Sequence, residues 1–258
     1  MIEWHGFNLP SRNNLRVAPL RSILHEEMAE NIGENIARVE ERIAAACRRS
    51  GRRREDLRLV AVSKTHPPEL IREAFAAGLR DFGENRVQEA NSKRPGLADL
   101  DATWHLVGHL QSNKVRAARE LFHWVHSLDS LRLAEKLVQA ASPGDARLPV
   151  LLEVNLGGEA SKAGVRAKEV AALAEQIAPM ETLALRGLMV IPPFLANAED
   201  VRPYFRQLRA LARDIETRNL PNVSMRELSM GMSHDFEVAI EEGATIVRVG
   251  TAIFGERK

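Results

Sequence analysis

The chain of 258 residues has room for one large domain or two small ones, and a single (β/α)8 barrel would use most of it. Its 36 Lys and Arg against 35 Asp and Glu give a net charge of +1, which disfavours a dedicated nucleic-acid-binding protein. The one cysteine, Cys47, rules out a disulfide within the chain and favours a reducing, cytoplasmic setting. The sequence has no run of about 18 apolar residues, so we expect no membrane span.

The first helical pattern covers residues 26–49, where apolar residues recur at steps of three and four. The residues before it, 1–25, lack the continuous apolar core of a signal peptide. We expect them to form an N-terminal extension, for which disorder is one reading. The main domain would then span residues 26–258, with the first helix as an addition to it.

From residue 57 onward, short β-rich runs alternate with helical patterns. The predicted strands cover residues 57–63, 81–83, 103–107, 124–126, 149–154, 185–188, 225–228 and 245–249. The predicted helices cover residues 68–77, 86–92, 113–120, 130–141, 167–178, 203–218 and 236–242. This alternation predicts a parallel sheet closed into a single TIM-type (β/α)8 barrel. A doubly wound open sheet is the alternative, disfavoured because no G-x-G-x-x-G follows the first strand.

Phosphate-binding residue types follow the last two predicted strands. Ser229 begins a Met-Gly-Met-Ser turn, and Gly250 and Thr251 follow the last strand. Barrel enzymes often bind phosphate with these two loops, because glycine admits an anion and free backbone N–H groups point at it. We favour a phosphate site here over the alternative that these are ordinary turn residues.

Lys64 directly follows the first predicted strand and would lie at the mouth of the barrel. By itself it is more simply a solvated surface lysine. A phosphate site across the barrel changes this, because pyridoxal 5′-phosphate (PLP) requires a lysine for its Schiff base and an anion clamp at its other end. Met189, which follows the sixth predicted strand, is expected to line the same pocket.

Arg248 shares the inward face of the last predicted strand with Ile246. Beside a pyridine nitrogen, an arginine would disfavour ring protonation and weaken the ring as an electron sink. A structural ion pair of Arg248 with Glu153 or Glu227 is the alternative.

Several motifs together resemble one family. They are Ala61-Val62-Ser63-Lys64, Phe82-Gly83-Glu84-Asn85, Trp104-His105-Leu106-Val107-Gly108, Ser161-Lys162-Ala163-Gly164, Leu228-Ser229-Met230-Gly231-Met232-Ser233 and Val247-Arg248-Val249-Gly250-Thr251. In them the chain resembles the pyridoxal phosphate homeostasis proteins, which are similar to the N-terminal domain of alanine racemase. The resemblance runs from about residue 32 to residue 255.

The resemblance implies a PLP-binding barrel with the cofactor on Lys64 and with Arg248 near the pyridine nitrogen. It also implies phosphate contacts from Ser229, Gly250 and Thr251, and it makes Asn85 the pocket asparagine of the family. Arg86 departs from the pattern, because an aromatic residue often stands there in the family.

The resemblance further implies a protein that buffers or delivers PLP, and so maintains the balance of vitamin B6, amino acids and keto acids. Alanine racemases add a second domain with a catalytic tyrosine, which we do not expect here. Tyr204, the one tyrosine, lies in a helical pattern and is expected to be a packing residue. A monomeric carrier that serves PLP-dependent apo-enzymes is therefore expected, and an amino-acid racemase of low activity is the alternative.

A zinc hydrolase is a third possibility, because four histidines lie close together in the sequence. They are His105, His109, His123 and His126. Their spacing does not offer the i, i+4 geometry of a helical zinc site, and Trp104 and Trp124 beside them indicate core packing. We therefore expect no metal site.

Overall fold

The computed structural model describes residues 1, 20–157 and 163–256 of the chain. Its strands are β1 (Arg58–Val62), β2 (Asp81–Glu84), β3 (Thr103–Leu106), β4 (Trp124–Leu128), β5 (Leu148–Asn155), β6 (Val165–Arg166), β7 (Leu183–Met189), β8 (Val223–Ser229) and β9 (Ile246–Val249). Within the described residues, parallel pairing runs from β4 through β1 and β9 to β5, and β4 pairs with β5 to close the ring. Strand β6 only extends β5 at one side. The predicted single (β/α)8 barrel is confirmed, and the open sheet is not found.

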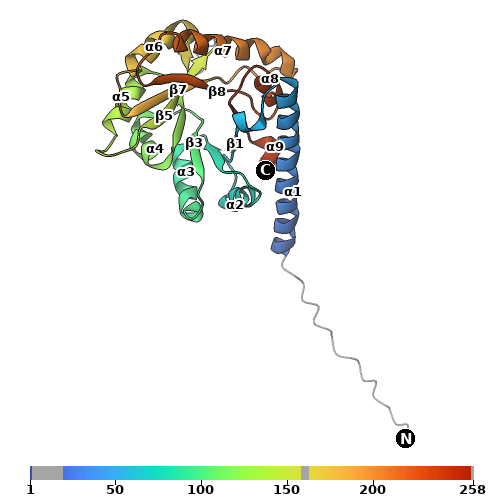
Figure 1. Cartoon of the computed structure of the whole chain (residues 1–258). Helices are drawn as coiled ribbons and strands as arrows, with labels where there is room; N and C mark the ends of the chain where they lie inside the picture. The colour runs from blue at the N-terminus through green and yellow to red at the C-terminus, as the bar shows by residue number, and fades with distance from the viewer. Residues whose placement is uncertain (2–19, 158–162, 257–258) are drawn as a thin grey trace.

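The helices lie outside the ring of strands (Figure 1). They are α1 (Leu20–Arg49), α2 (Pro68–Ala76), α3 (Val87–Lys93), α4 (Val115–Leu121), α5 (Leu131–Gln139), α6 (Val170–Ile177), α7 (Arg202–Glu216), α8 (Phe236–Glu241) and α9 (Thr251–Phe254). Two predicted helices begin as 3₁₀ turns, at Ser112–Lys114 and Ala167–Glu169, before they continue as α4 and α6. None of the described helices is both apolar and long enough to cross a membrane.

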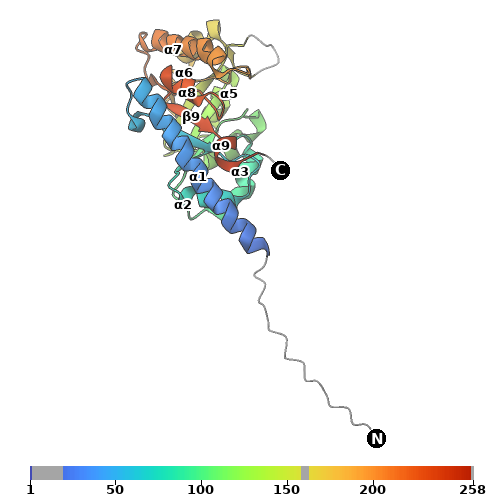
Figure 2. The ribbon, with the colours of Figure 1, turned by 90° about the vertical axis from the view of Figure 1, so that its right-hand side faces the viewer.

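Helix α1 packs along one side of the barrel against α2, α8 and α9 (Figures 1 and 2). Its apolar stripe is buried as the spacing predicts, for example at Ile36 and Ile43. The helix begins at Leu20 instead of Glu26, because apolar residues continue at steps of four from Ile32 back through Met28 and Leu24 to Leu20. Of the predicted extension 1–25, residues 2–19 lie outside the described part of the chain.

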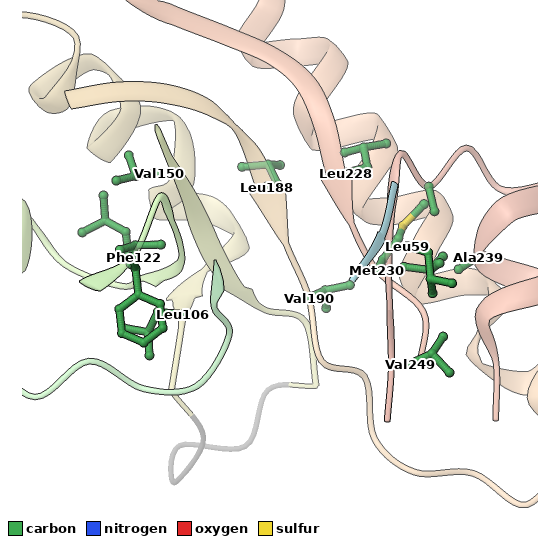
Figure 3. Packing of buried hydrophobic residues seen from close by; sticks show 14 of the residues in the cluster. Leu59, Leu106, Phe122, Val150, Leu188, Val190, Leu228, Met230, Ala239 and Val249 are labelled. Carbon is green, nitrogen blue, oxygen red and sulfur yellow. The ribbon is translucent and has the colours of Figure 1, made fainter. Parts of the chain in front are cut away.

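The strands divide their side chains between two separate cores, as the alternation of a β-strand requires. Leu59 and Val249 face the helices and belong to the main core, where Figure 3 shows them with Ala239 of α8. Val60 and Ile246, from the same two strands, pack inside the barrel. The interior is therefore filled, and a ligand can enter only at its rim.

Candidate cofactor site

The predicted site residues lie at or just beyond the carboxyl ends of the strands. These residues are Lys64 after β1, Asn85 after β2, Met189 at the end of β7, Ser229 at the end of β8, Arg248 near the end of β9, and Gly250 and Thr251 beyond it. Because the barrel strands are parallel, these ends share one rim. The tertiary structure therefore gathers them in one region, and the contact of each with a cofactor stays a prediction.

The backbone before Lys64 is held from outside the barrel wall. Lys93 of α3 donates to the carbonyl oxygen of Ser63 (2.9 Å) and to the carboxylate of Glu84 (2.7 Å). The Ser63 hydroxyl donates to the same carboxylate at 2.7 Å. The Ser63 side chain thus faces α3. Lys64 follows in a turn, which the N–H of His66 closes by donating to the Ser63 carbonyl oxygen at 3.1 Å. That Lys64 points toward the barrel mouth stays a prediction.

The residue after Lys64 is held by the same group of side chains. The carboxylate of Glu89 accepts hydrogen bonds from the backbone N–H of Thr65 and from Lys93. Thr65 has a φ of 67°, a conformation that a β-branched residue adopts only when its surroundings impose it. Ser63, Glu84, Glu89 and Lys93 are called the Lys93 cluster below. They fix the turn that carries Lys64.

The Lys93 cluster contains two carboxylates and one ammonium, and the pKa values of the two carboxyl groups are shifted in opposite directions. Burial raises the pKa of Glu84, and the hydrogen bonds from Lys93 and Ser63 only partly offset it. Burial also acts on Glu89, but hydrogen bonds from Lys93 and from the Thr65 N–H outweigh it and lower the pKa of that carboxyl. Of the two carboxylates, Glu84 is the fully buried one, and its Oε2 has no hydrogen-bond partner among the described residues.

Arg248 lies inside the barrel, paired in register with Val60 of β1, and is 4% exposed. Its guanidinium donates to the Ser229 hydroxyl oxygen at 2.6 Å and to the Val190 carbonyl oxygen at 2.9 Å. Burial lowers the pKa of Arg248 to about 10, so the group is charged at neutral pH. Both acceptors are neutral.

The alternative of an ion pair between Arg248 and Glu153 or Glu227 is wrong. Glu227 accepts a hydrogen bond from Thr245, toward the amino end of the neighbouring strand. Glu153 acts on the pKa of Arg248 only through space, as a nearby charge. The buried cation therefore faces no carboxylate in direct contact within the described residues.

Behind Ser229, two buried histidines continue the polar contacts across the barrel interior. His126 Nδ1 lies 2.9 Å from Ser229 Oγ, and His126 Nε2 lies 3.0 Å from His105 Nδ1. His105 Nε2 lies 2.9 Å from Asp81 Oδ1 on β2. Burial lowers the pKa of both histidines, that of His126 the more strongly. The sequence reasoning missed this chain, although the inward positions of β2, β3 and β4 could have signalled it.

The loop between β8 and α8 meets the start of α9 at the rim. Ser233 Oγ accepts hydrogen bonds from the backbone N–H groups of Gly250 (3.2 Å) and Ala252 (3.3 Å). A Cβ at Gly250 would lie 3.2 Å from the Val62 carbonyl oxygen, so this position suits glycine. Two N–H groups that converge on one oxygen can equally receive a phosphate oxygen. Ser233 was not predicted as a site residue.

Glycine at position 231 is required by the same loop. Gly231 has a φ of 91°, and a Cβ there would lie 2.6 Å from the Cβ of Ala239. The Met-Gly-Met-Ser turn can therefore pack against α8 only with glycine at this position. This explains one residue of the motif in physical terms.

Asn85 and Arg86 line a cavity of about 600 Å³ above the ends of β2 and β3, together with Gly108, His109 and Lys114. None of the described residues that line the cavity is acidic. Met189 is fully buried among the interior apolar side chains instead. Asn85 thus lies at an open surface, and Met189 lies beneath the rim.

The four histidines considered as zinc ligands do not converge on a single point. His105 and His126 bond to each other, whereas the exposed His109 lies 3.4 Å from Asp129 and His123 accepts a backbone N–H of β3. Within residues 20–157 and 163–256, no three His, Cys, Asp or Glu side chains form a group able to hold a metal ion.

Comparison with known proteins first defines the class. Residues 35–258 match the family described as alanine racemase, N-terminal domain, so the chain belongs to it. Alanine racemase from Clostridium difficile 630 has the same fold at 14% identity, with a TM-score of 0.68 over 88% of this chain and 57% of that chain.

Closer relatives define the family within that class. A pyridoxal phosphate homeostasis protein of Aquifex aeolicus is 50% identical over 88% of this chain and 99% of its own length. PipY of Synechococcus elongatus PCC7942, solved with PLP bound, is 43% identical with a TM-score of 0.76, over 87% of this chain and all of that chain. The chain therefore belongs to the pyridoxal phosphate homeostasis proteins.

Proposed function

We propose that this protein binds PLP at the barrel rim, as a Schiff base with Lys64, and acts as a PLP carrier. The observation that carries the proposal is the buried guanidinium of Arg248, which has only neutral partners and lies on the strand beside β1. A cofactor ring above it would present its nitrogen to this cation. The name of the relatives and the PLP bound to PipY support the same assignment.

Three groups of this chain match three parts of PLP. Lys64 supplies the amine for the aldehyde, Arg248 faces the pyridine nitrogen, and the N–H groups around Gly250 and Thr251 receive the phosphate. In enzymes, PLP supplies an electron sink, which protonation of the ring nitrogen strengthens. The positive charge of Arg248 disfavours that protonation and so favours holding the cofactor over using it.

The experiment is an absorption titration of the protein with PLP, followed by borohydride reduction and peptide mapping. We expect a Schiff-base band, with the reduced adduct on Lys64, and loss of both in Lys64→Ala. Lys136→Ala, on the outer helix α5, is the matched control and should keep the band. A band that survives in Lys64→Ala, or adducts spread over surface lysines, would contradict the assignment.

A racemase of low activity is the second candidate, because alanine racemases share the fold. Two-base racemisation needs a second acid or base opposite the lysine. Tyr204 packs against the main core from α7, in the outer layer of helices, and we do not assign it as this second acid or base. Formation of D-amino acids by the PLP-loaded protein faster than by free PLP would favour the racemase.

The proposed carrier releases its PLP to PLP-dependent apo-enzymes. It acts in the cytoplasm as a monomer. Transfer is tested by mixing the loaded protein with an apo-enzyme and following recovery of its activity. A trap for free PLP separates direct transfer from simple dissociation. Light scattering coupled to size-exclusion chromatography tests the monomer.

A further inference from the structure

Five polar side chains form a continuous line of hydrogen bonds inside the barrel. The line runs from Asp81 through His105, His126 and Ser229 to Arg248, with contacts of 2.9, 3.0, 2.9 and 2.6 Å. These residues come from five different strands and are called the histidine chain below. Apolar side chains such as Val60 and Leu151 also pack in the interior of the barrel.

The protons of the histidine chain can be assigned from its acidic end. The guanidinium of Arg58 lies 3.5 Å from the Asp81 carboxylate, and a carboxylate in an ion pair only accepts hydrogen bonds. His105 Nε2 must then be the donor. A neutral imidazole has one donor and one acceptor nitrogen, so His105 Nδ1 accepts.

The same rule carries the assignment to the other end. His126 Nε2 donates to His105, so His126 Nδ1 accepts, and its neighbour Ser229 must donate its hydroxyl hydrogen to it. The free lone pairs of Ser229 then face Arg248, which has no capacity to accept. Each residue therefore donates a hydrogen bond to the next one, in a single direction from Arg248 to Asp81.

We propose that His105 and His126 are positioning residues, which lock the Ser229 hydroxyl so that it accepts from Arg248 and thereby hold the guanidinium in place for the cofactor ring. This inference rests on the proposed PLP function. It gives Ser229 a role toward Arg248 in place of the phosphate contact that the resemblance implies, because the hydrogen of Ser229 is committed to His126.

The alternative arrangements need either a neutral carboxyl group at Asp81 or an extra buried charge on a histidine. The reversed direction requires a protonated carboxyl group at Asp81, which would break the ion pair with the guanidinium of Arg58. A doubly protonated histidine would add a cation beside the buried Arg248. Glu153 on β5 and Asp235 before α8 face Arg248 only through space. The neutral, one-directional chain avoids both costs.

The first test uses the cofactor-free protein with ¹⁵N-labelled histidine. Near neutral pH, NMR should show His105 and His126 as neutral rings, each protonated at Nε2 and bare at Nδ1. Protonation at Nδ1 of either ring, or a charged ring, would overturn the assigned direction. This measurement does not depend on PLP binding.

The second test is a double-mutant cycle on PLP affinity with Ser229→Ala, His126→Leu and the double variant. Each single substitution should raise the Kd for PLP about tenfold, since each removes the same support of a charged group. The double variant should add less than about twofold, because both changes break one chain. His123→Gln, outside the chain, is the control and should stay within about twofold.

The outcomes are distinguishable. Wild-type affinity in Ser229→Ala, or single effects that multiply in the double variant, would overturn the positioning role. Melting curves of the cofactor-free variants separate loss of affinity from loss of the fold, and Ser229→Ala is the smallest change should His126→Leu fail to fold. If the wild-type protein itself forms no Schiff base, the proposed function fails. The NMR result still tests the direction of the hydrogen bonds in the histidine chain, because it does not depend on PLP.

Discussion

The Lys93 cluster and the histidine chain are two buried polar networks that hold different parts of the barrel. The Lys93 cluster lies between the wall and α3, is ionic, and holds backbone atoms of Ser63 and Thr65. The histidine chain lies inside the wall, is neutral between its charged ends, and holds the side chain of Arg248. The first fixes the turn that carries Lys64, and the second fixes the guanidinium of Arg248 on the neighbouring strand β9.

The two networks stabilise buried charge in different ways. In the Lys93 cluster the ammonium touches two carboxylates at 2.7 Å, so removal of the cation leaves buried negative charge. In the histidine chain the buried cation of Arg248 is stabilised by oriented dipoles. A network of dipoles must be satisfied in a single direction, so it specifies orientation as well as contact.

The largest expected effect on stability comes from removing the cation of the Lys93 cluster. Lys93→Met removes the cation from beside Glu84 and Glu89 and should destabilise the protein by about 3–5 kcal/mol. Urea unfolding measures this change in the free energy of unfolding. Lys168→Met, at an exposed position, is the control and should change stability by less than about 0.5 kcal/mol. Equal stability of the two variants would mean that the cluster adds nothing to the fold.

A smaller effect should appear in the pH dependence of stability, through the histidine chain. His105 and His126 have a lowered pKa in the folded protein, so below about pH 6.5 the unfolded chain binds more protons than the folded one. Stability therefore rises with pH in that window and falls on acidification, by about 1.4 kcal/mol per pH unit for each histidine that stays neutral.

Urea unfolding between about pH 7 and about pH 5 measures this slope. Since His126→Leu removes one of the two groups, its slope should be smaller than that of the wild type. His109→Leu, at an exposed ring, should keep the wild-type slope. A His126→Leu slope equal to that of the wild type would mean that this ring is protonated in the folded state.

The smallest effect is expected for Glu84→Gln. The raised pKa of Glu84 reflects its burial, and Glu89 remains to balance Lys93. An amide oxygen can still accept from Ser63 and Lys93, so the loss should be below about 1.5 kcal/mol in urea unfolding. A cost as large as that of Lys93→Met would show that the cluster needs both negative charges.

Much of the site could be predicted because its signals are local. The placement of Lys64 after a strand, the glycines after β8 and β9, and the inward face of Arg248 all follow from short patterns. The partner of Arg248 could not be predicted in this way. Ser229 pairs with Ile246 in the register of β8 and β9, which places its hydroxyl beside Arg248 and leaves Glu227 beside Thr245.

The sequence alone determined the barrel, the inward and outward faces of its strands and the residue types at its rim, because periodicity and turn chemistry are properties of neighbouring residues. Only the tertiary structure decided which polar groups meet. His126 and Ser229 are 103 residues apart in the chain, and their contact exists because closure of the ring brings β4 and β8 to face each other across the interior. The direction of the hydrogen bonds follows from that closure, since each donor and acceptor is fixed by the next strand's side chain.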